Sequence, residues 1–421
     1  MSLESKTLEN CRLCQGRNLQ VLLDLGVMAS CGNFPKREEE DLNGPMNLVR
    51  CTGCGLVQMG YSYHMPVFFG EGYGYRSGLN RTMVNHLHSV VRSVQEVRPL
   101  AEGEYVLDIG ANDGTSLKAY PADANRVGMD PTISTFKDFY PDDIIQIADF
   151  FSSKNWVERV GNHKASIVSS IAMFYDIERP VDFAKEIASI LAPDGVWVFE
   201  QSYLPLMLER RSFDTICHEH LEYYTLSQIE RILSEAGLRV VAVDLNDING
   251  GSFRITATHA TSPIEETDPE QLSELRKSDA AFNENFDAIF SDFSGRLDEL
   301  KKALLGCFKD LASQGKTVHG YGASTKGNTL LQLYGIDAAL MPMIADVNER
   351  KWGLMTPGTH IPIVSEEESK RHRPDYYMVL PWHFRDGILE REKEFIALGG
   401  GFIFPLPQVE IVDQSGSRVV S

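Results

Sequence analysis

The segment DTICHEHLEYY, residues 214–224, concentrates side chains that can transfer protons. It holds one cysteine, two histidines, two glutamates and two tyrosines. Three interpretations stay open: a metal site with His218 and His220 as ligands, acid–base catalysis by a histidine with a carboxylate to orient it, or a polar structural cluster. If the segment is extended, both histidines lie on one face. Acid–base catalysis is favoured, because the unperturbed imidazole pKa of about 6.5 suits proton abstraction near neutrality and no third metal ligand is evident.

Two CxxC pairs near the N-terminus form a candidate metal site. They are CRLC, with Cys11 and Cys14, and CTGC, with Cys51 and Cys54. Together they offer the four thiolates of a tetrahedral zinc site. The segment between them is longer than the roughly 15–20 residues of common zinc ribbons, and buried thiols without metal remain an alternative. Because four thiolates leave no open coordination position, we expect a structural Zn²⁺ that stabilises a small N-terminal module.

The elements that would position the proton-handling segment begin with EYVLDIGANDGTSL, residues 104–117. The pattern predicts a buried strand, a glycine-containing turn and a helix, so that the backbone can approach a ligand closely. The next strand ends at Asp130, whose carboxylate suits ribose hydroxyls. Asp149 and Phe150 follow a third strand and suit an adenine. Alternating strands and helices predict a parallel sheet that binds its ligand at the carboxyl ends of the strands.

A second nucleotide-type unit is predicted in the C-terminal third, after a long amphipathic helix that begins near FDAIF. The segment TVHGYGASTKGNTLL predicts a strand ending near Gly322 and a helix beginning near Asn328. Lys326-Gly327 reverses the Gly-Lys order of a P-loop, which argues against ATP hydrolysis. A turn of this composition still suits a phosphate, through backbone N–H groups and one cation. A Rossmann-like domain without a ligand is the alternative.

The order of these motifs is similar to a known family. The strand-turn-helix pattern resembles class I S-adenosylmethionine-dependent methyltransferases. With CxxC…CxxC, HEHLEYY, NGGSFR and GYGASTKGNTLL it resembles, over nearly the whole chain, the bacterial deoxysugar C-methyltransferases of the C-3 type, which act on nucleotide-linked 4-keto sugars. The family's Tyr-x-Glu-His pattern has its tyrosine where this chain has Cys217. Many members also have a histidine where this chain has Phe174.

The resemblance implies an α/β fold of three parts around one cleft. These are a zinc-binding domain (1–68), an S-adenosylmethionine-dependent methyltransferase domain (69–265), and a linker helix with a C-terminal Rossmann-like domain that binds the sugar nucleotide (266–421). The glycine- and tyrosine-rich connector of residues 68–80 is expected either to close over the ligands as a flap or to be an ordinary packed connector. Tyr75 matches the family's flap tyrosine.

The implied site residues fall into three groups. The catalytic candidates are His220, Glu219, His218, Tyr75 and Tyr223. The expected cofactor-binding residues are Asp108, Gly110, Asn112, Asp113, Gly114, Asp130, Pro131, Asp149, Phe150 and Ser170. The expected substrate-binding residues are Gly250, Gly251, Ser252, Gly322, Ala323, Ser324, Lys326, Asn328, Asp346 and Asn348.

The expected reaction is methyl transfer from S-adenosylmethionine to a sugar carbon next to a ketone. Transfer to carbon requires removal of an α-proton, here by His220 oriented by Glu219, and hydrogen bonds to the enolate oxygen from His218, Tyr223 or Tyr75. Two alternatives are an O- or N-methyltransferase of a nucleotide sugar and a non-catalytic zinc protein that binds S-adenosylmethionine. The proton-handling segment argues against the second, because a sensor needs no base.

Composition limits the other possibilities. A chain of 421 residues predicts two or three domains. Its formal charge of −19 argues against a nucleic-acid partner. No apolar run approaches the roughly 18 residues of a membrane span, and MSLESKTLENC lacks the apolar core of a signal peptide. Seven cysteines, an odd number, do not suggest a disulfide framework. We therefore expect a cytoplasmic protein. The sequence does not indicate an oligomeric state, and a monomer is compatible with it.

Overall fold

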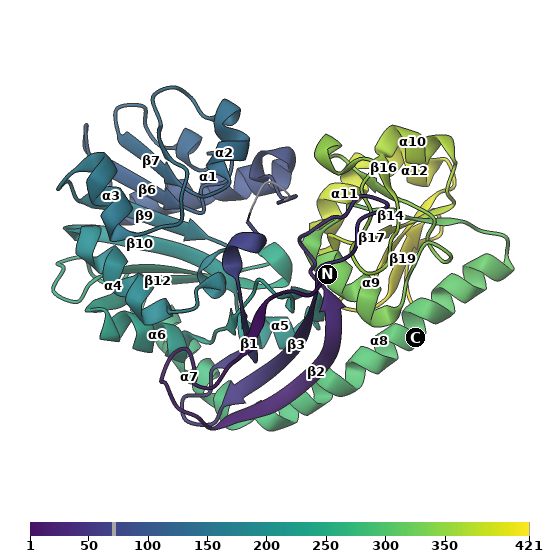
Figure 1. Ribbon diagram of the computed structural model, residues 1–421, viewed down its shortest axis with the longest axis horizontal. Coiled ribbons are helices and arrows are strands. Elements are labelled where there is room, and N and C mark those ends of the chain that lie inside the picture. The colour runs from purple at the N-terminus through teal and green to yellow at the C-terminus, as the bar shows by residue number, and fades with distance from the viewer. Residues whose placement is uncertain (70–72, 421) are drawn as a thin grey trace.

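The computed structural model describes residues 1–69 and 73–420, which form an N-terminal module and two α/β units (Figure 1). The N-terminal sheet lies between the two units, and a long helix, α8 (Phe286–Ser313), leads from one to the other. Gly70, Glu71 and Gly72, part of the connector expected to be a flap, lie outside the described residues. None of the described helices has the length and apolar character to cross a membrane.

The first α/β unit contains a seven-stranded sheet in the order β12-β13-β10-β9-β6-β7-β8. Only β13 runs antiparallel to its neighbours. The strands are β6 (Tyr105–Ile109), β7 (Asn125–Met129), β8 (Ile145–Ile147), β9 (Ala165–Ile171), β10 (Leu191–Ser202), β12 (Leu238–Asn246) and β13 (Ser252–His259). The helices are α1 (Arg81–Val97), α2 (Ile133–Phe136), α3 (Ser153–Val160), α4 (Pro180–Ile190), α5 (Leu204–Glu209) and α6 (Leu226–Glu235). The strand order reverses between β6 and β9, which is where parallel sheets of this kind open a ligand crevice.

The second α/β unit has its own seven-stranded sheet, in the order β16-β15-β14-β17-β18-β19-β20. The strands are β14 (Val318–Tyr321), β15 (Ile344–Asp346), β16 (Ile363–Ser365), β17 (Tyr376–Val379), β18 (Gly401–Phe404), β19 (Glu410–Asp413) and β20 (Gly416–Val419). The helices are α9 (Thr325–Tyr334), α10 (Glu366–Arg371), α11 (Arg385–Arg391) and α12 (Lys393–Ala397), and α7 (Pro269–Glu284) precedes α8. Five strands are parallel, and their order reverses between β14 and β17.

The N-terminal module is completed by a strand from the proton-handling segment. Its sheet has the order β11-β4-β3-β2. The strands are β2 (Leu19–Ala29), β3 (Asn43–Cys51), β4 (Val57–Met59) and β11 (Glu222–Tyr223), and a separate pair joins β1 (Ser5–Thr7) to β5 (Tyr61–Tyr63). β11 pairs with β4, with Glu222 opposite Gln58 and Tyr223 opposite Val57. The segment that carries His220 is therefore attached to the metal-binding module only two residues later.

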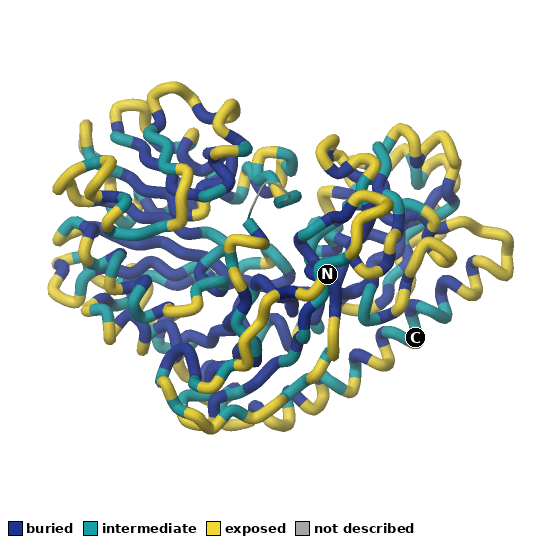
Figure 2. The backbone as a smooth tube through the Cα atoms, viewed as in Figure 1, coloured by how far each residue is buried: buried dark blue, intermediate teal, exposed yellow. Residues whose placement is uncertain are grey.

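Burial follows the periodicity of the sequence (Figure 2). All but the last residue of β9 are buried, as expected for a central parallel strand covered on both faces. The buried residues of α8 recur every three or four positions, which makes one apolar stripe along the helix. That stripe packs into a core shared by the N-terminal sheet and the second α/β unit. A separate core joins the cysteine knuckles to the first α/β unit.

Two local predictions are wrong. The part of the segment that carries the histidines is not extended, although β11 follows it. A short 3₁₀ helix, η6 (Phe213–Thr215), is followed by a turn in which the His220 N–H donates to the Cys217 carbonyl oxygen at 3.2 Å. The helix expected near Asn328 begins at Thr325 instead. Ser324 caps it, its hydroxyl accepting from the Gly327 N–H at 3.0 Å, a cap that the sequence ASTKG allows.

Candidate active site

A cavity of about 710 Å³ lies between the two α/β units and collects most of the predicted site residues. The first unit contributes the carboxyl ends of β6, β7 and β9. The second unit contributes the turn after β14 and the segment after β15. The described part of the connector that follows the N-terminal module closes one side, with Tyr73 and Tyr75. His220 and Glu219 line the same cavity, so the base candidate faces both predicted ligand sites.

The turn after β6 forms the expected cofactor end. Gly110 has a φ of +71°, and a Cβ added there would lie 3.2 Å from Met173, so the backbone conformation and close packing both favour glycine. The Asn112 N–H donates to Asp130 Oδ2 at 2.9 Å. Asp130 Oδ1 accepts from the N–H and hydroxyl of Thr132, both at 2.6 Å. Because a carboxylate offers about four acceptor positions, one position remains for a ribose hydroxyl.

The cavity receives only half of the predicted cofactor-binding residues. Those that line it are Gly110, Asn112, Asp130, Pro131 and Phe150. Five do not line it: Asp108, Asp113, Gly114, Asp149 and Ser170. Asp108, Asp113 and Ser170 are buried behind the turn and accept hydrogen bonds from neighbouring side chains. Burial raises the pKa of Asp108 to about 7, and the Ser169 hydroxyl opposes this shift. These residues support the turn rather than face a ligand.

Three residues at the end of β9 line the cavity although the sequence did not indicate them: Ile171, Ala172 and Met173. Ala172 has a positive φ of 55°, which is uncommon for a residue other than glycine. The conformation turns the chain out of the sheet at the point where the strand order reverses. An alanine carries no sequence signal for such a backbone, so these residues could be found only from the structure.

The His220 ring is held through one nitrogen, which leaves the other nitrogen free to accept a proton. Nδ1 lies 2.7 Å from the Thr215 carbonyl oxygen, which can only accept, so Nδ1 carries the proton and Nε2 carries the lone pair. The Tyr175 ring packs 4.1 Å from the imidazole ring, and the Leu221 N–H donates to the Tyr175 carbonyl oxygen. Burial lowers the His220 pKa to about 3; the Thr215 bond opposes this and the Lys326 charge adds to it. In the protein without ligands, the His220 ring is therefore neutral at physiological pH.

Glu219 lines the cavity, but it makes no hydrogen bond to His220 in the described structure. The group that orients the ring is the Thr215 carbonyl oxygen. Oε2 of Glu219 is buried and has no hydrogen-bond partner among the described residues. Burial raises the pKa of Glu219, and hydrogen bonds from the Gly32 backbone and Cys217 oppose the shift.

His218 and Tyr223 face away from the cavity, contrary to the expectation that they could hold an enolate oxygen. His218 is 0 % exposed, its Nε2 lies 3.2 Å from the Gly44 carbonyl oxygen, and its ring packs edge-on against Tyr63. Tyr223 is buried on β11 in the core of the N-terminal module. The turn at residues 218–219 separates the two histidines, so they share no face and no metal site.

Other acidic and aromatic groups surround His220 in their place. Tyr175 and Asp176 line the cavity and follow Phe174, which is fully buried in an aromatic cluster with Trp197 and Tyr224. The chain thus has a buried phenylalanine at the family's histidine position and a tyrosine at the cavity beside it. Cys217, at the family's tyrosine position, is also fully buried, and burial raises its pKa well above the usual range.

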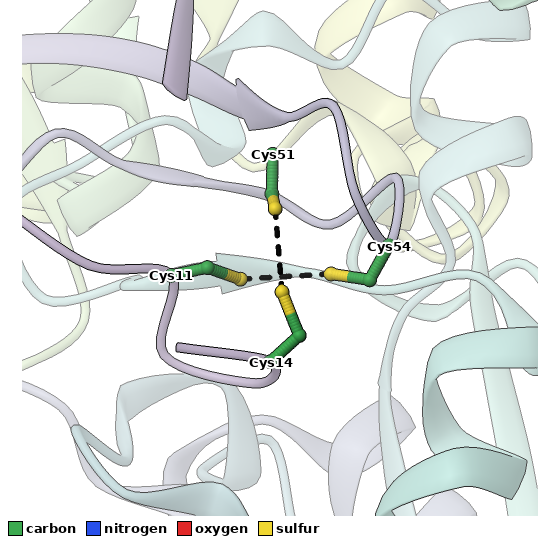
Figure 3. Close-up of side chains that lie close together, drawn as sticks. All are labelled: Cys11, Cys14, Cys51 and Cys54. Carbon is green, nitrogen blue, oxygen red and sulfur yellow. Dashed lines mark hydrogen bonds between the residues drawn. The ribbon is translucent and has the colours of Figure 1, made fainter. Parts of the chain in front are cut away.

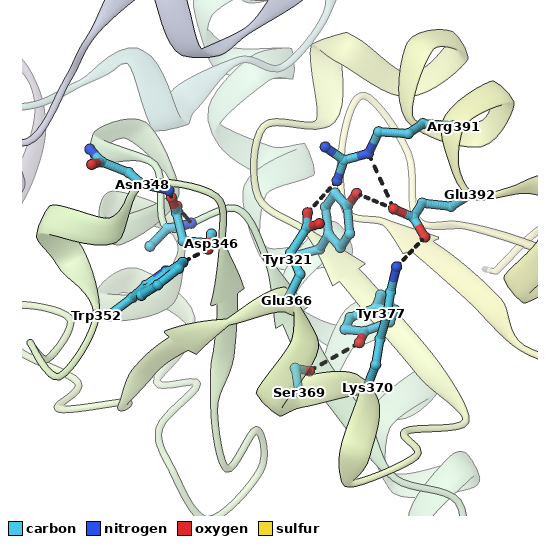
Figure 4. A network of polar contacts seen from close by, with 11 residues as sticks. Tyr321, Asp346, Asn348, Trp352, Glu366, Ser369, Lys370, Tyr377, Arg391 and Glu392 are labelled. Carbon is cyan, nitrogen blue, oxygen red and sulfur yellow. Dashed lines mark hydrogen bonds and ion pairs between the residues drawn. The ribbon is translucent and has the colours of Figure 1, made fainter.

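The turn before α9 forms the expected phosphate end. Gly322, Ala323, Ser324 and Lys326 line the cavity, as do Asp346 and Asn348. Asp346 accepts from the Ala323 N–H at 2.6 Å and from the Asn348 N–H at 2.7 Å, and so fixes both segments. Figure 4 shows Asp346 and Asn348 beside a second network, in which Glu392 accepts from Tyr321, Lys370 and Arg391. That network ties α10 and α11 to β14.

Four predicted substrate-binding residues do not reach the cavity: Gly250, Gly251, Ser252 and Asn328. Asn328 is buried and donates to the Cys31 carbonyl oxygen at 2.7 Å. Gly250, with a φ of +86°, packs against Ser212 and Trp382. Their neighbours Ile248 and Asn249 line the cavity instead, together with His383 from the segment after β17. The sequence indicated the NGG motif, but the residue of that motif that lines the cavity is Asn249 and not Gly250 or Gly251.

The four cysteines of the CxxC pairs converge as predicted (Figure 3). All four sulfurs lie within 4.8 Å of one another, with Cys11 Sγ 3.6 Å from Cys54 Sγ and Cys14 Sγ 3.4 Å from Cys51 Sγ. A tetrahedral zinc with Zn–S bonds of about 2.3 Å requires sulfur separations of about 3.8 Å, so the donor set fits Zn²⁺. It is the single cluster of this kind in residues 1–69 and 73–420.

Arg12, inside the first CxxC pair, connects the cysteine cluster to the active-site segment. Its guanidinium donates to the carbonyl oxygens of Met59 and Tyr61 at 2.7 and 2.9 Å. It also lies 3.5 Å from the buried Glu222 carboxylate and 3.2 Å from Glu178. Because Glu222 is on β11 and Glu178 lines the cavity, this buried cation ties the metal-binding knuckle to the two segments around His220.

Comparison with known proteins gives three consecutive family matches. A zinc binding domain matches residues 11–69, a methyltransferase domain matches residues 83–243, and a C-methyltransferase C-terminal domain matches residues 247–407. The C-methyltransferase NovU of Streptomyces niveus is 29 % identical over 415 residues, which cover 97 % of this chain and 97 % of that protein. The predicted fold class and the predicted cofactors, S-adenosylmethionine and zinc, are confirmed by these matches and by the cysteine cluster.

Solved structures that resemble part of the chain are methyltransferases and related enzymes. The magnesium protoporphyrin IX methyltransferase of Synechocystis with bound S-adenosylhomocysteine is 15 % identical, with a TM-score of 0.33 over 43 % of this chain and 88 % of that one. A cyclopropane synthase of Mycobacterium tuberculosis is 18 % identical, with a TM-score of 0.31 over 37 % and 62 %. TM-scores this low do not support a fold assignment. The assignment to the methyltransferase fold is based on the family matches and the strand order.

Proposed function

We propose, from the premise that this chain belongs to the C-methyltransferase family and uses S-adenosylmethionine, that its acceptor is a carbon next to the ketone of a nucleotide-linked deoxysugar. The observation that carries the proposal is the placement of His220. A neutral imidazole with a free Nε2 lies in one cavity with a cofactor turn on one side and a phosphate turn on the other. A base in that position is what methylation of carbon needs, whereas methylation of nitrogen needs little base assistance.

The residues at the cofactor end would hold the donor. Asp130 would accept a ribose hydroxyl with its remaining acceptor position, and the Gly110 backbone would allow close approach. Phe150, which is 40 % exposed, offers an apolar face for the adenine. S-adenosylmethionine, when bound, supplies an electrophilic methyl group. Met173 and Tyr175 also line the cavity, Met173 beside Gly110 and the Tyr175 ring against His220.

The residues at the phosphate end would hold the acceptor. The capped N-terminus of α9 presents backbone N–H groups after a glycine turn, which suits a diphosphate. Asp346 and Asn348 lie at the carboxyl end of β15, where a ribose or base can be recognised. The sugar would then reach toward His220. His220 would remove the α-proton onto Nε2, the electron pair would form the enolate, and the proton would later leave the ring to solvent.

The test is an incubation of the protein with S-adenosylmethionine and a panel of nucleotide-linked keto-deoxysugars. We expect S-adenosylhomocysteine and a product methyl group attached to carbon, identified by its NMR shift. A methoxy or N-methyl signal would contradict the proposal and support O- or N-methylation. No turnover with any keto sugar would also contradict it.

The His220→Asn variant tests the base. We expect a loss of turnover of about 10²–10⁴-fold and loss of α-proton exchange with deuterated water. His372→Asn is the matched control, because His372 is exposed and does not line the cavity. Near-normal exchange in His220→Asn would show that another group is the base.

A further inference from the structure

The ammonium group of Lys326 is directed away from the expected phosphate turn. Lys326 stands in the first turn of α9, but its Nζ donates to the Asn249 carbonyl oxygen at 2.5 Å. It also lies 4.0 Å from Asp214 Oδ1. Both partners belong to the chain that forms the first α/β unit, so the side chain crosses from one unit to the other.

The groups around this ammonium are built to hold a cation. Asp214, on η6, is 1 % exposed, and its Oδ2 accepts from Trp382 Nε1 at 2.8 Å. Asn249 has a φ of +54°, and this left-handed backbone directs its carbonyl oxygen at Lys326. The two glycines that follow in NGG allow the chain to pass close to Trp382, because a Cβ at Gly250 would lie 3.0 Å from the indole ring.

Asn249 and Asp214 do not satisfy all the hydrogen-bond donors of the Lys326 ammonium group. It has three N–H donors, and one is taken by the Asn249 carbonyl oxygen. The Asp214 oxygen at 4.0 Å is beyond hydrogen-bond distance. Lys326 lines the cavity together with His220 and His383. Its remaining N–H donors can therefore reach a molecule bound in the cavity. Two N–H groups are therefore available to a ligand.

The same ammonium acts electrostatically on both cavity histidines. Its charge lowers the pKa of His220 and of His383, in each case after the larger effect of burial. Burial lowers the pKa of Lys326 itself, and the charge of Asp214 opposes that shift. Among the charged side chains of residues 1–69 and 73–420, Lys326 is the one whose charge contributes to the shift of the His220 pKa.

We propose that Lys326 is a catalytic residue that donates a hydrogen bond to the substrate oxygen on which negative charge develops when His220 removes the α-proton. This inference rests on the proposed function and adds to it the group that stabilises the enolate. The structural reason is the shared cavity wall: His220 and the Lys326 side chain, which is 13 % exposed, line the same cavity from opposite α/β units. A substrate that contacts both His220 and Lys326 must lie between the two α/β units.

The step balances in protons and electrons. The α C–H bond breaks, its proton goes to His220 Nε2, and its electron pair forms the C=C bond of the enolate. The former carbonyl oxygen becomes the oxyanion that accepts from Lys326 Nζ. When the enolate carbon bonds to the donor's methyl group, the S–CH3 bond breaks, its electron pair stays on sulfur, and neutral S-adenosylhomocysteine leaves. The C=O bond reforms, Lys326 keeps its proton, and His220 releases its proton to solvent.

A different set of groups is available for the diphosphate. The N-terminus of α9 offers backbone N–H groups, and Lys351, which also lines the cavity, donates to the Ala323 carbonyl oxygen at 2.7 Å beside that turn. Lys326 is thus not needed as the cation of the phosphate turn, which is the role that its sequence position predicts. The two roles make different predictions for the same substitution.

The experiment compares Lys326→Met, Lys326→Arg and Lys301→Met in the full-length protein. Lys301 is the matched control, because its Nζ also donates to a backbone carbonyl oxygen, that of Leu333 at 2.9 Å, outside the cavity. Three quantities are measured: turnover, α-proton exchange with deuterated water, and thermal stabilisation by UDP, dTDP, GDP and CDP. Removal of an oxyanion donor typically costs about 10²–10³-fold in kcat.

We expect Lys326→Met to lose turnover and exchange by about 10²–10³-fold while the best nucleoside diphosphate still stabilises it as it does the wild type. Loss of the cation should also raise the His220 pKa and move the acid limb of the exchange rate to higher pH. Lys326→Arg should leave the acid limb of the exchange rate at its wild-type pH, because the positive charge at position 326 remains. Lys301→Met should match the wild type in all three measurements.

Two results would overturn the assignment. Normal kcat and exchange in Lys326→Met would do so, and so would lost nucleotide stabilisation with normal kcat at saturation, which would make Lys326 a phosphate ligand. Failure of the proposed function is a separate outcome, because the wild type would then show neither turnover nor exchange with any keto sugar.

Discussion

At the scale of the residue, the role of each histidine in residues 214–224 depends on its position in the turn. His218 and His220 are both buried histidines two positions apart, yet one bonds to Gly44 in the N-terminal module and the other faces the cavity. Thr215 makes the difference, because its carbonyl oxygen fixes the tautomer of His220 and leaves Nε2 as the acceptor. His218 is therefore a structural residue whose effect belongs to stability.

Acid should expose this structural role of His218. Its pKa is lowered to about 4 by burial, whereas an unfolded histidine titrates near 6.5. Between these values the unfolded chain binds more protons, so the stabilisation is present above pH 6.5 and is lost as pH falls toward 4. We expect His218→Gln to remove this loss, at most about 1.4 kcal/mol per pH unit.

Urea unfolding of wild type and His218→Gln at several pH values between 4 and 7.5 measures the difference. Other buried groups titrate in both proteins and cancel in that difference. Parallel stability curves would mean that His218 is not buried as a neutral ring.

At the scale of the element, short segments link sites that are distant in the chain. β11 has only two residues, but it joins the segment that carries His220 to β4 and so to the second cysteine knuckle. η6 supplies Thr215 to orient the base and Asp214 to face Lys326. On the other side, Thr329 of α9 donates to the Ile216 carbonyl oxygen at 2.8 Å, so the same loop is fixed from both units.

Zinc removal should therefore impair catalysis as well as folding. Without the metal the β3–β4 hairpin that carries Cys51 and Cys54 loses its fixed end, and the strand that anchors the His220 segment loses its partner. We expect a chelator to lower the thermal midpoint and the turnover together, and Zn²⁺ but not Mg²⁺ to restore both. Full turnover in protein shown by metal analysis to lack zinc would contradict this link.

The NGG turn makes a second prediction at this scale. Gly250→Ala places a Cβ 2.6 Å from Ser212 Oγ in a backbone with a φ of +86°, and we expect a loss of about 1–3 kcal/mol in unfolding free energy. Turnover should fall as well, because the displaced turn carries the Asn249 carbonyl oxygen. Gly306→Ala in α8 is the control, since nothing lies within 4 Å of its added Cβ.

Chemical unfolding of both alanine variants gives the comparison. Gly306→Ala should be neutral or stabilising by about 0.5–1 kcal/mol, because alanine favours a helix over glycine. Equal stability of Gly250→Ala and wild type would mean that the turn can relax.

At the scale of the whole molecule, the cavity belongs to neither α/β unit alone. One core joins the N-terminal sheet to the second unit through α8, and another joins the cysteine knuckles to the first unit. The N-terminal module therefore packs against both units that form the cavity. Each unit contributes one of the two proposed ligand turns, at the reversal point of its own sheet.

The two ligand turns should be separable by mutation. Gly110→Ala puts a Cβ 3.2 Å from Met173, and Gly322→Ala puts one 2.8 Å from Pro381, both at positive φ. We expect Gly110→Ala to lose stabilisation by S-adenosylhomocysteine but not by a nucleoside diphosphate, and Gly322→Ala to show the reverse.

Thermal shift measures both effects, since a ligand at 100 times its Kd stabilises by about 2.7 kcal/mol. Each variant is the control for the other. Loss of both ligands in either variant would mean that the two sites are not independent.

The sequence by itself determined the features that depend on local pattern. The zinc ligands follow from two CxxC pairs, the strand-turn-helix units from apolar runs and glycine turns, and α8 from its spacing of apolar residues. Each is a property of neighbouring residues, and both the fold class and the domain order could be predicted from them.

Only the tertiary structure decided which side chains face the cavity. Tyr175 and His383 carry no local signal, and Asn249 lies in the NGG motif but faces the cavity in place of its glycines. His218 turns away from the cavity, and Lys326 lines it with its ammonium group bonded to Asn249. The orientation of each depends on a partner far away in the chain, such as Gly44 for His218 or Asn249 for Lys326. A single turn at residues 218–219 reversed the predicted face of His218, because a change of register redirects the side chains that follow.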